Sequence, residues 1–131
     1  MPSVGRRRPV LKRTEHVEQR EFVSWFRKSY PGVKIIAIPN GGKRSKTEAM
    51  RLKVEGVTAG VYDLFIPAWL LWVEFKLADK TKARVSKDQK AWGRYVESIG
   101  HKQFVAYGLE DAKTKIEHHL QQSQDASPPD Q

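Results

Sequence analysis

Residues 60–66, Gly-Val-Tyr-Asp-Leu-Phe-Ile, and residues 70–76, Leu-Leu-Trp-Val-Glu-Phe-Lys, are two apolar runs of strand length with Pro-Ala-Trp between them. A buried sheet normally carries no charge, but these runs contain three charged residues: Asp63, Glu74 and Lys76. A charged group in a half-buried strand is costly unless it is paired or binds a metal ion. The simplest account is a pair of carboxylates that hold a cation, with a lysine beside them.

The spacing of the charged residues predicts their arrangement. Side chains alternate between the two faces of a strand, so Glu74 and Lys76 share one face and the apolar side chains of the run share the other. If the Pro-Ala-Trp-Leu segment forms a four-residue hairpin loop, Ile66 pairs with Leu71 and Asp63 with Glu74. Directly paired residues hold their Cβ atoms about 5 Å apart, which allows two carboxylates to bind one divalent ion.

The chemistry of these groups favours phosphodiester hydrolysis. Carboxylate oxygens suit Mg²⁺ or Mn²⁺, so Asp63 and Glu74 are predicted metal ligands. Such an ion acidifies a bound water and neutralises charge on a phosphate, and Lys76 adds a positive charge close by. The alternative reading of Glu74-x-Lys76 alone is a surface ion pair, a common pattern. An aspartate eleven residues before Glu74, on the neighbouring strand, favours the functional reading.

A further carboxylate comes from a helix predicted over residues 15–30, with Thr14 as its N-cap. Successive helical residues rotate by about 100°, which places Glu15 and Gln19 within the apolar arc of this helix and Glu18 at its edge. Glu15 either joins the catalytic group or merely complements the helix dipole. Glu18 is the less favoured of the two acids.

Gln89 also has two readings. The pattern Ser86-Lys87-Asp88-Gln89 is typical of a capping box, in which the fourth side chain reaches back to the N-cap backbone. Gln89 also lies on the apolar stripe of the predicted helix that follows. We therefore expect Gln89 to cap this helix and to point toward the sheet face that bears Lys76.

The remaining periodicity predicts an α/β domain. Beyond the two runs, we expect helices over residues 15–30, 47–54, 86–99 and 110–121 and strands over residues 33–38 and 102–107. Thr47 is the expected N-cap of the second helix, and the third is expected to turn inward the side chains of Trp92, Tyr95, Val96 and Ile99. This mixed order, with a hairpin in the middle, favours a central sheet flanked by helices. Residues 1–13 are predicted to be a flexible basic arm, 14–122 one folded domain and 123–131 a disordered tail.

The composition restricts the partners. The chain has 131 residues, a formal net charge of +9 and no cysteine, which excludes disulfides, thiolate metal sites and cysteine nucleophiles. Neither a membrane-spanning apolar run nor a secretory signal is found in the sequence, and a cytoplasmic location is expected. Such a positive charge favours a polyanionic partner such as DNA. Candidate phosphate contacts lie in segments predicted to be loops: Asn40, Lys43, Arg44, Lys46, Lys80, Lys82 and Arg84.

Several short motifs, in this order and spacing, resemble the VRR-NUC (virus-type replication-repair nuclease) branch of the PD-(D/E)XK nucleases, in particular the small stand-alone phage type. They extend over about residues 15–120. The motifs are Glu15-x-x-x-Gln19, Ile38-Pro39-Asn40-Gly41-Gly42-Lys43-Arg44, Arg51-Leu52-Lys53-x-Glu55-Gly56-Val57, Gly60-Val61-Tyr62-Asp63-Leu64, Glu74-Phe75-Lys76 and Ser86-x-x-Gln89-Lys90-x-Trp92. One departure is Tyr62, where the family usually has proline.

The resemblance implies a restriction-endonuclease-like mixed sheet flanked by helices and a metal-dependent nuclease. It implies that Asp63 and Glu74 bind Mg²⁺ or Mn²⁺ and that Lys76 is the catalytic lysine. Glu15 would be the acid of the first helix and a third metal ligand, and Gln89 a further catalytic residue near the site. Stand-alone members are similar to Holliday-junction resolvases in being dimeric. A homodimer that cuts branched DNA during replication, recombination or repair, in a bacterial or phage-infected cell, is therefore expected.

Two other functions are compatible with parts of the sequence. One is a DNA-binding module that keeps the nuclease fold without cleaving, which the intact acids and lysine argue against. The other is a basic interaction domain for a partner other than nucleic acid, which leaves Asp63 and Glu74 unexplained.

Overall fold

The computed structural model describes residues 13–39, 45–81 and 83–125 of the chain. Its centre is a four-stranded sheet in the order β1-β2-β3-β4. The strands are β1 (Ile36–Ala37), β2 (Leu64–Ile66), β3 (Leu71–Lys76) and β4 (Lys102–Tyr107). The first three are antiparallel to one another, and β4 runs parallel to β3. The sheet is therefore mixed, as predicted.

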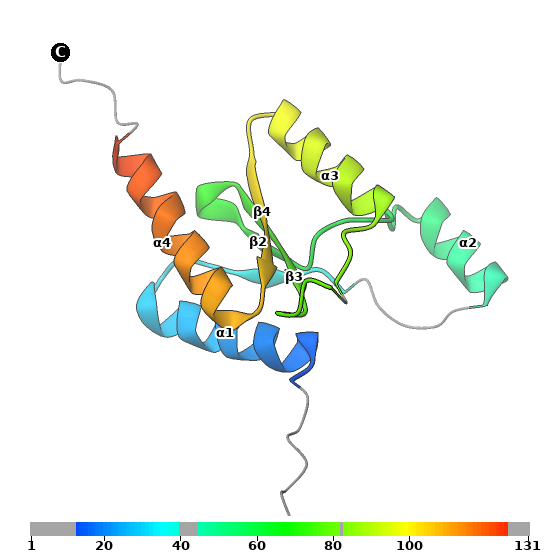
Figure 1. Ribbon diagram of the computed structural model, residues 1–131. Helices are drawn as coiled ribbons and strands as arrows, with labels where there is room; N and C mark the ends of the chain where they lie inside the picture. The colour runs from blue at the N-terminus through cyan, green and yellow to red at the C-terminus, as the bar shows by residue number, and fades with distance from the viewer. Residues whose placement is uncertain (1–12, 40–44, 82, 126–131) are drawn as a thin grey trace, which may run out of the picture.

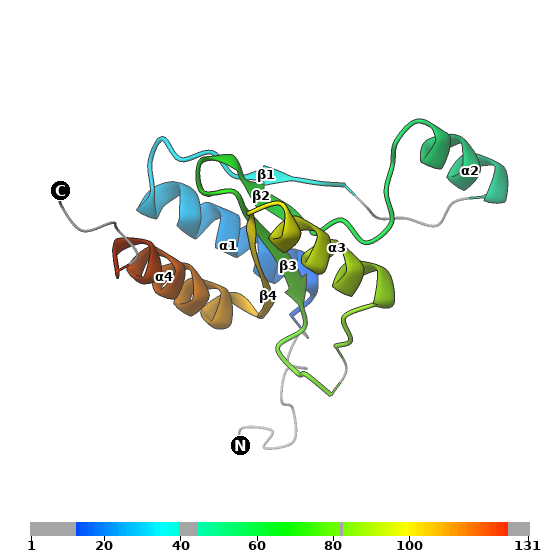
Figure 2. The same cartoon turned by 90° about the horizontal axis from the view of Figure 1, so that it is seen from above.

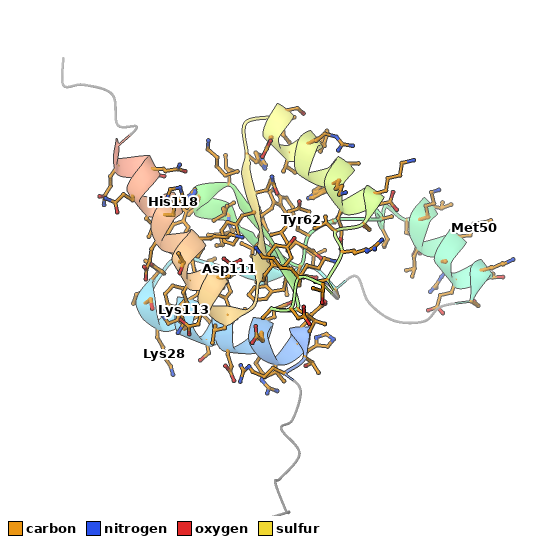
Figure 3. The ribbon with its side chains drawn as sticks, in the orientation of Figure 1. Lys28, Met50, Tyr62, Asp111, Lys113 and His118 are labelled. Carbon is orange, nitrogen blue, oxygen red and sulfur yellow. The ribbon has the colours of Figure 1, made fainter. Side chains whose placement is uncertain are left out.

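Helices cover both faces of this sheet. Two of them, α1 (Glu15–Ser29) and α4 (Leu109–Asp125), lie side by side on one face, and α3 (Lys87–Ser98) lies on the other (Figures 1 and 2). The fourth, α2 (Lys46–Val54), has no buried residue and stands apart from the sheet. Figure 3 shows Met50 on this outlying helix. In the part of the chain that the structure describes, no helix is long and apolar enough to cross a membrane.

The alternation of residues along β3 builds the core. Val73 and Phe75 are completely buried on the face covered by α1 and α4, where Phe75 packs against Phe22 of α1 at 5.3 Å between ring centroids. Burying a side chain of this size contributes roughly 2–3 kcal/mol, so the apolar face anchors the strand. Glu74, on the opposite face, is consequently held in a fixed position.

The predicted hairpin is confirmed. Ile66 pairs with Leu71, and the connection is a single 3-10 turn, η1 (Pro67–Trp69), followed by Leu70 in the left-handed conformation with φ of 47°. The ladder continues through Leu64 opposite Val73. Asp63, which directly precedes β2, therefore lies next to Glu74, as the register requires.

Several element boundaries differ from the predictions. The strand expected over residues 33–38 is only Ile36–Ala37, because its partner β2 is itself short and β1 is an exposed edge. The N-cap of α2 is Ser45 and not Thr47: the Ser45 hydroxyl accepts the Glu48 N–H. Helix α4 continues through Asp125, into the segment predicted to be a tail.

Two side chains expected to face inward from α3 are exposed. Tyr95 is 54% and Ile99 51% exposed, whereas Gly93 and Val96 are buried. The helix approaches the sheet through its smallest residue, so only a narrow stripe is covered. Gly93 is needed there, because a Cβ at this position would lie 2.6 Å from the Tyr62 hydroxyl oxygen.

Candidate functional site

A cleft of about 680 Å³ lies where four elements meet: the start of α1, the entry to β2, the end of β3 and the start of α3. It brings together all five residues predicted to be catalytic: Glu15, Asp63, Glu74, Lys76 and Gln89. His16, Gln19, Ser86 and Asp88 are among its other lining residues. The segments are far apart in the sequence, so their convergence is a property of the fold.

The side chains of Asp63 and Glu74 each accept a hydrogen bond from a backbone N–H of the other's segment. The Asp63 N–H donates to Glu74 Oε1 at 3.1 Å, and the Phe75 N–H donates to Asp63 Oδ2 at 2.8 Å. Because backbone donors fix one oxygen of each carboxylate, the two side chains stay next to one another. No described donor reaches Asp63 Oδ1, which leaves that oxygen available to a ligand.

The environment opposes negative charge at both acids. Glu74 is only 3% exposed, and its burial, followed by the charge of Asp63, raises its pKa to about 7. Burial likewise raises the pKa of Asp63, against the Phe75 N–H and the Lys76 charge. Lys76 Nζ lies 3.5 Å from Glu74 Oε2 and is the described cation that forms an ion pair with this acid. One ammonium group beside the buried Glu74 and the half-buried Asp63 leaves the site short of positive charge.

Gln89 caps α3 and also points toward the sheet face that bears Lys76, where it contacts Glu74. Its Oε1 accepts the Ser86 N–H at 2.9 Å and closes the capping box. Its Nε2 donates to Glu74 Oε2 at 2.6 Å. The same side chain therefore begins helix α3 and fixes the second oxygen of Glu74.

Glu15 and Glu18, the acids in the first turn of α1, have separate positions. Glu15 is exposed and lines the cleft. Glu18 instead accepts the Leu109 N–H at 2.7 Å at the start of α4 and pairs with Arg13 at 2.9 Å. Glu18 therefore has a structural role, and the sequence had made it the less favoured candidate for the site.

His16 is a lining residue that sequence reasoning missed. It is exposed at the mouth of the cleft, and its charge lowers the pKa of Asp63, against the larger effect of burial. Its position three residues before Gln19, on the same side of a helix, was the available signal. That spacing alone does not distinguish a site residue from an ordinary surface histidine.

The donor set fits a hard divalent ion. Among residues 13–39, 45–81 and 83–125, no three His, Asp or Glu side chains lie close enough together to form a metal site alone. Zinc sites generally need three or four protein ligands, whereas Mg²⁺ is commonly held by one or two carboxylates together with water and substrate phosphate. Asp63 and Glu74 provide such a pair, and Asp63 has a free oxygen. The role of Glu15 as a third ligand stays a prediction.

The predicted phosphate contacts lie outside this cleft or outside the described residues. Asn40, Lys43, Arg44 and Lys82 belong to the latter group. Lys46 begins the outlying α2, Lys80 lies over the Tyr107 ring at 4.9 Å, and Arg84 is exposed. None of these three lines the cleft.

Tyr62, which stands where the resemblance expects proline, is a core residue. It is 2% exposed, lies between the sheet and α3, and donates a 2.9 Å hydrogen bond to Gln103 Oε1 (Figure 3). Burial, followed by the charge of Glu74, raises its pKa to about 12. The phenol is therefore a neutral hydrogen-bond donor that holds the chain directly before Asp63.

Comparisons with known proteins agree with this architecture. No family model matches the chain, and no curated protein matches its sequence. A solved structure described as a "VRR_NUC domain protein" is similar, with a TM-score of 0.69 and 23% sequence identity, over 83% of this chain and 89% of that one. A likeness at this identity shows the fold, and the VRR-NUC fold implied by the motifs is therefore confirmed.

Proposed function

We propose that the protein is a metal-dependent endonuclease that hydrolyses phosphodiester bonds in DNA. The observation that carries the proposal is the convergence of Asp63, Glu74 and Lys76 in one cleft, with Glu74 buried, Asp63 half-buried and both acids fixed by hydrogen bonds. Two adjacent acids withdrawn from water destabilise a fold, and such costs are retained mainly at functional sites, where carboxyl groups in a cleft with perturbed pKa values are typical. The nuclease-type fold supports the same conclusion.

Asp63 and Glu74 would hold Mg²⁺ or Mn²⁺, which when bound supplies an acidified water and neutralises charge on the phosphate. The residues of the chain have their own tasks. Gln89 and the Asp63 N–H orient Glu74, and the Phe75 N–H orients Asp63. Lys76, 3.5 Å from Glu74, provides a fixed positive charge for the negative charge that builds up on the phosphate during attack by water. The bond formed joins the water oxygen to phosphorus, and a bridging P–O bond breaks.

The net charge of +9 and the fold support DNA as the substrate, and the stand-alone VRR-NUC resemblance supports branched DNA and a homodimer. The test is incubation of the protein with four-way-junction, flap and linear duplex DNA, in Mg²⁺, in Mn²⁺ and in EDTA. We expect metal-dependent cutting that disappears in Asp63→Asn and Lys76→Ala. Sedimentation of the free protein tests the dimer separately.

Binding to DNA without cutting, by a folded sample in either metal, would instead identify a non-catalytic DNA-binding module. No affinity for DNA at low salt would exclude both functions. Circular dichroism of each variant provides the control for folding, since loss of activity in an unfolded protein carries no information.

A further inference from the structure

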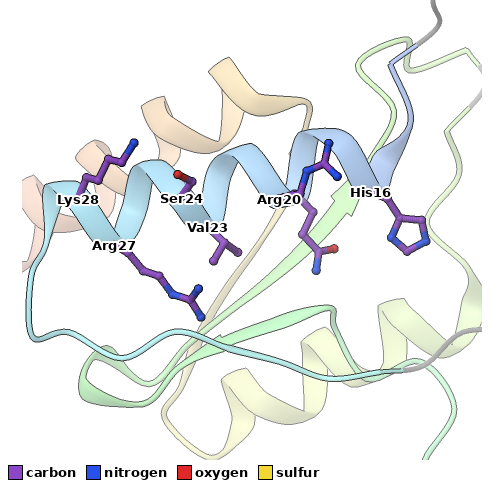
Figure 4. A pocket seen from close by; sticks show the side chains of 7 residues that line it. His16, Arg20, Val23, Ser24, Arg27 and Lys28 are labelled. Carbon is purple, nitrogen blue, oxygen red and sulfur yellow. The ribbon is translucent and has the colours of Figure 1, made fainter.

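A second cavity, of about 700 Å³, continues from the catalytic cleft along α1 (Figure 4). His16 and Gln19 line both cavities, so the two are contiguous at the start of the helix. The remaining lining residues of the second cavity are Arg20, Val23, Ser24, Arg27 and Lys28. Its wall carries cations and no acid.

The spacing of these residues forms a ridge on the helix. His16, Arg20, Val23 and Arg27 follow the i, i+4, i+7, i+11 pattern, and a rotation of about 100° per residue puts them within an arc of about 60°. The three acids of the helix, Glu15, Glu18 and Glu21, lie outside this arc by the same rotation. Glu18 accepts the Leu109 N–H of α4, and Glu21 pairs with Arg13. The ridge therefore carries two guanidinium groups and no acid.

The cations on this wall are not neutralised by neighbours. Arg20, Arg27 and Lys28 form no ion pair with any acid in the part of the chain that the structure describes. Other exposed cations, among them Lys90, Arg94 and Lys102, are also unpaired in the described part of the chain. The α1 wall is distinguished by three such cations along one cavity whose lining contains no acid. Uncompensated cations along a cavity attract a polyanion, and guanidinium groups bind phosphate in a bidentate manner.

The length of the ridge suits a nucleic-acid strand. Eleven residues of helix rise about 16 Å from His16 to Arg27, which corresponds to about five phosphates of one strand of a duplex. A second copy of this chain is the alternative occupant, but a net charge of +9 on each copy opposes that contact. Charge complementarity and continuity with the catalytic cleft both favour DNA.

We propose that α1 forms a backbone-binding track that carries one DNA strand away from the phosphate at Asp63 and Glu74, with Arg20 and Arg27 as its principal phosphate contacts. This inference rests on the proposed nuclease function. It assigns the DNA contact to a regular helix, in addition to the basic loops singled out in the sequence.

The first test is the salt dependence of DNA binding by Arg20→Gln/Arg27→Gln, with glutamine chosen because it keeps helix propensity. Each lost phosphate contact reduces the slope of log K against log salt by about 0.9 for duplex and about 0.7 for single-stranded DNA. We therefore expect the slope to fall by about 1.4–1.8. The matched control is Arg94→Gln/Lys102→Gln, which removes the same charge from exposed, unpaired residues that line neither cavity and should keep the wild-type slope.

The second test uses the absence of cysteine from the chain. Ser24 lines the track, whereas Ser29, also exposed on α1, does not. In a Lys76→Ala background, which leaves DNA uncut, Ser24→Cys should form a disulfide with DNA that carries thiol-tethered nucleotides, and Ser29→Cys should not.

The two proposals fail in different ways. If the wild-type protein binds and cuts DNA but Arg20→Gln/Arg27→Gln keeps its slope, or both cysteines react equally, the track is wrong and the nuclease stands. If the double variant alters sedimentation but not DNA binding, the cavity is an interface between copies. If the wild-type protein has no affinity for DNA, both proposals are overturned.

Discussion

Gln89 Nε2 donates a 2.6 Å hydrogen bond to Glu74 Oε2, while Oε1 of the same amide accepts the Ser86 N–H at the start of α3. One side chain thus ties the first turn of a helix to a buried acid fifteen residues away. The folding of α3 and the position of Glu74 depend on each other through this amide.

The first prediction separates these two roles of Gln89. Ser86→Ala removes the N-cap hydroxyl and should lower the free energy of unfolding by about 1 kcal/mol. Gln89→Ala should cost a similar amount and also release Glu74 Oε2, so we expect its kcat for DNA cleavage to fall at least tenfold below that of Ser86→Ala. Urea denaturation and cleavage kinetics measure the two effects. Equal activity of the two variants would show that the Glu74 contact has no catalytic role.

The second prediction concerns the cost of burying Glu74. Its pKa of about 7 in the folded protein lies above the ordinary value of 4.5, so the folded state retains a proton that the unfolded state loses. The contribution of protonated Glu74 to the free energy of unfolding is fully present below pH 4.5 and is lost as the pH rises through about 7. Without metal, wild-type stability should therefore fall between pH 5 and pH 8, by up to about 3 kcal/mol from this group.

Glu74→Gln lacks this titration and is the matched control. Its urea midpoint should change much less than that of the wild-type protein over the same pH range. If the urea midpoints of the two proteins changed with pH in parallel, ionisation of Glu74 would not be the cause of the loss of stability.

The third prediction concerns metal binding. Carboxylates bind metal in their ionised form, so Mg²⁺ or Mn²⁺ should raise the melting temperature more at pH 8 than at pH 5.5. Asp63→Asn should lose most of this increase. Lys76→Ala should keep it while losing cleavage, because Lys76 supplies charge to the phosphate and no ligand to the ion. An increase that is independent of pH would place the metal elsewhere.

The fourth prediction compares Glu15 and Glu18 of α1. Glu18→Ala removes the acceptor for the Leu109 N–H and the partner of Arg13, and should cost about 1–2 kcal/mol of stability with DNA cleavage retained. Glu15→Ala removes an exposed side chain at the cleft and should have the opposite effect, with lower activity and unchanged stability. Thermal unfolding and cleavage rates of the two variants test this directly.

The fifth prediction concerns Tyr62 and Gly93. In Gly93→Ala the new Cβ would lie 2.6 Å from the Tyr62 hydroxyl oxygen, so we expect a loss of about 1–3 kcal/mol from overpacking. Tyr62→Phe removes that oxygen. The double variant should therefore be more stable than the sum of the single effects predicts, and a double-mutant cycle measures this coupling. Additive effects would show that the cost of Gly93→Ala does not arise from contact with the Tyr62 hydroxyl.

Local features of the sequence predicted much of this fold. The β3 alternation placed Glu74 and Lys76 on one face, and the short connection set Ile66 opposite Leu71. Both are consequences of backbone geometry over a few residues. The boundaries of β1 and the exposure of Tyr95 were predicted wrongly, because they depend on how far a neighbouring element extends.

The sequence by itself determined the order of the elements and the presence of two acids and a lysine beside one hairpin, since periodicity and turn residues act over short distances. Only the tertiary structure decided that Gln89 donates a hydrogen bond to Glu74 and that Glu18 accepts one from the start of α4. It also decided that the cations of α1 line a cavity that continues from the catalytic cleft. These contacts join segments far apart in the chain. They depend on how helices pack on the sheet, which no local pattern of residues specifies.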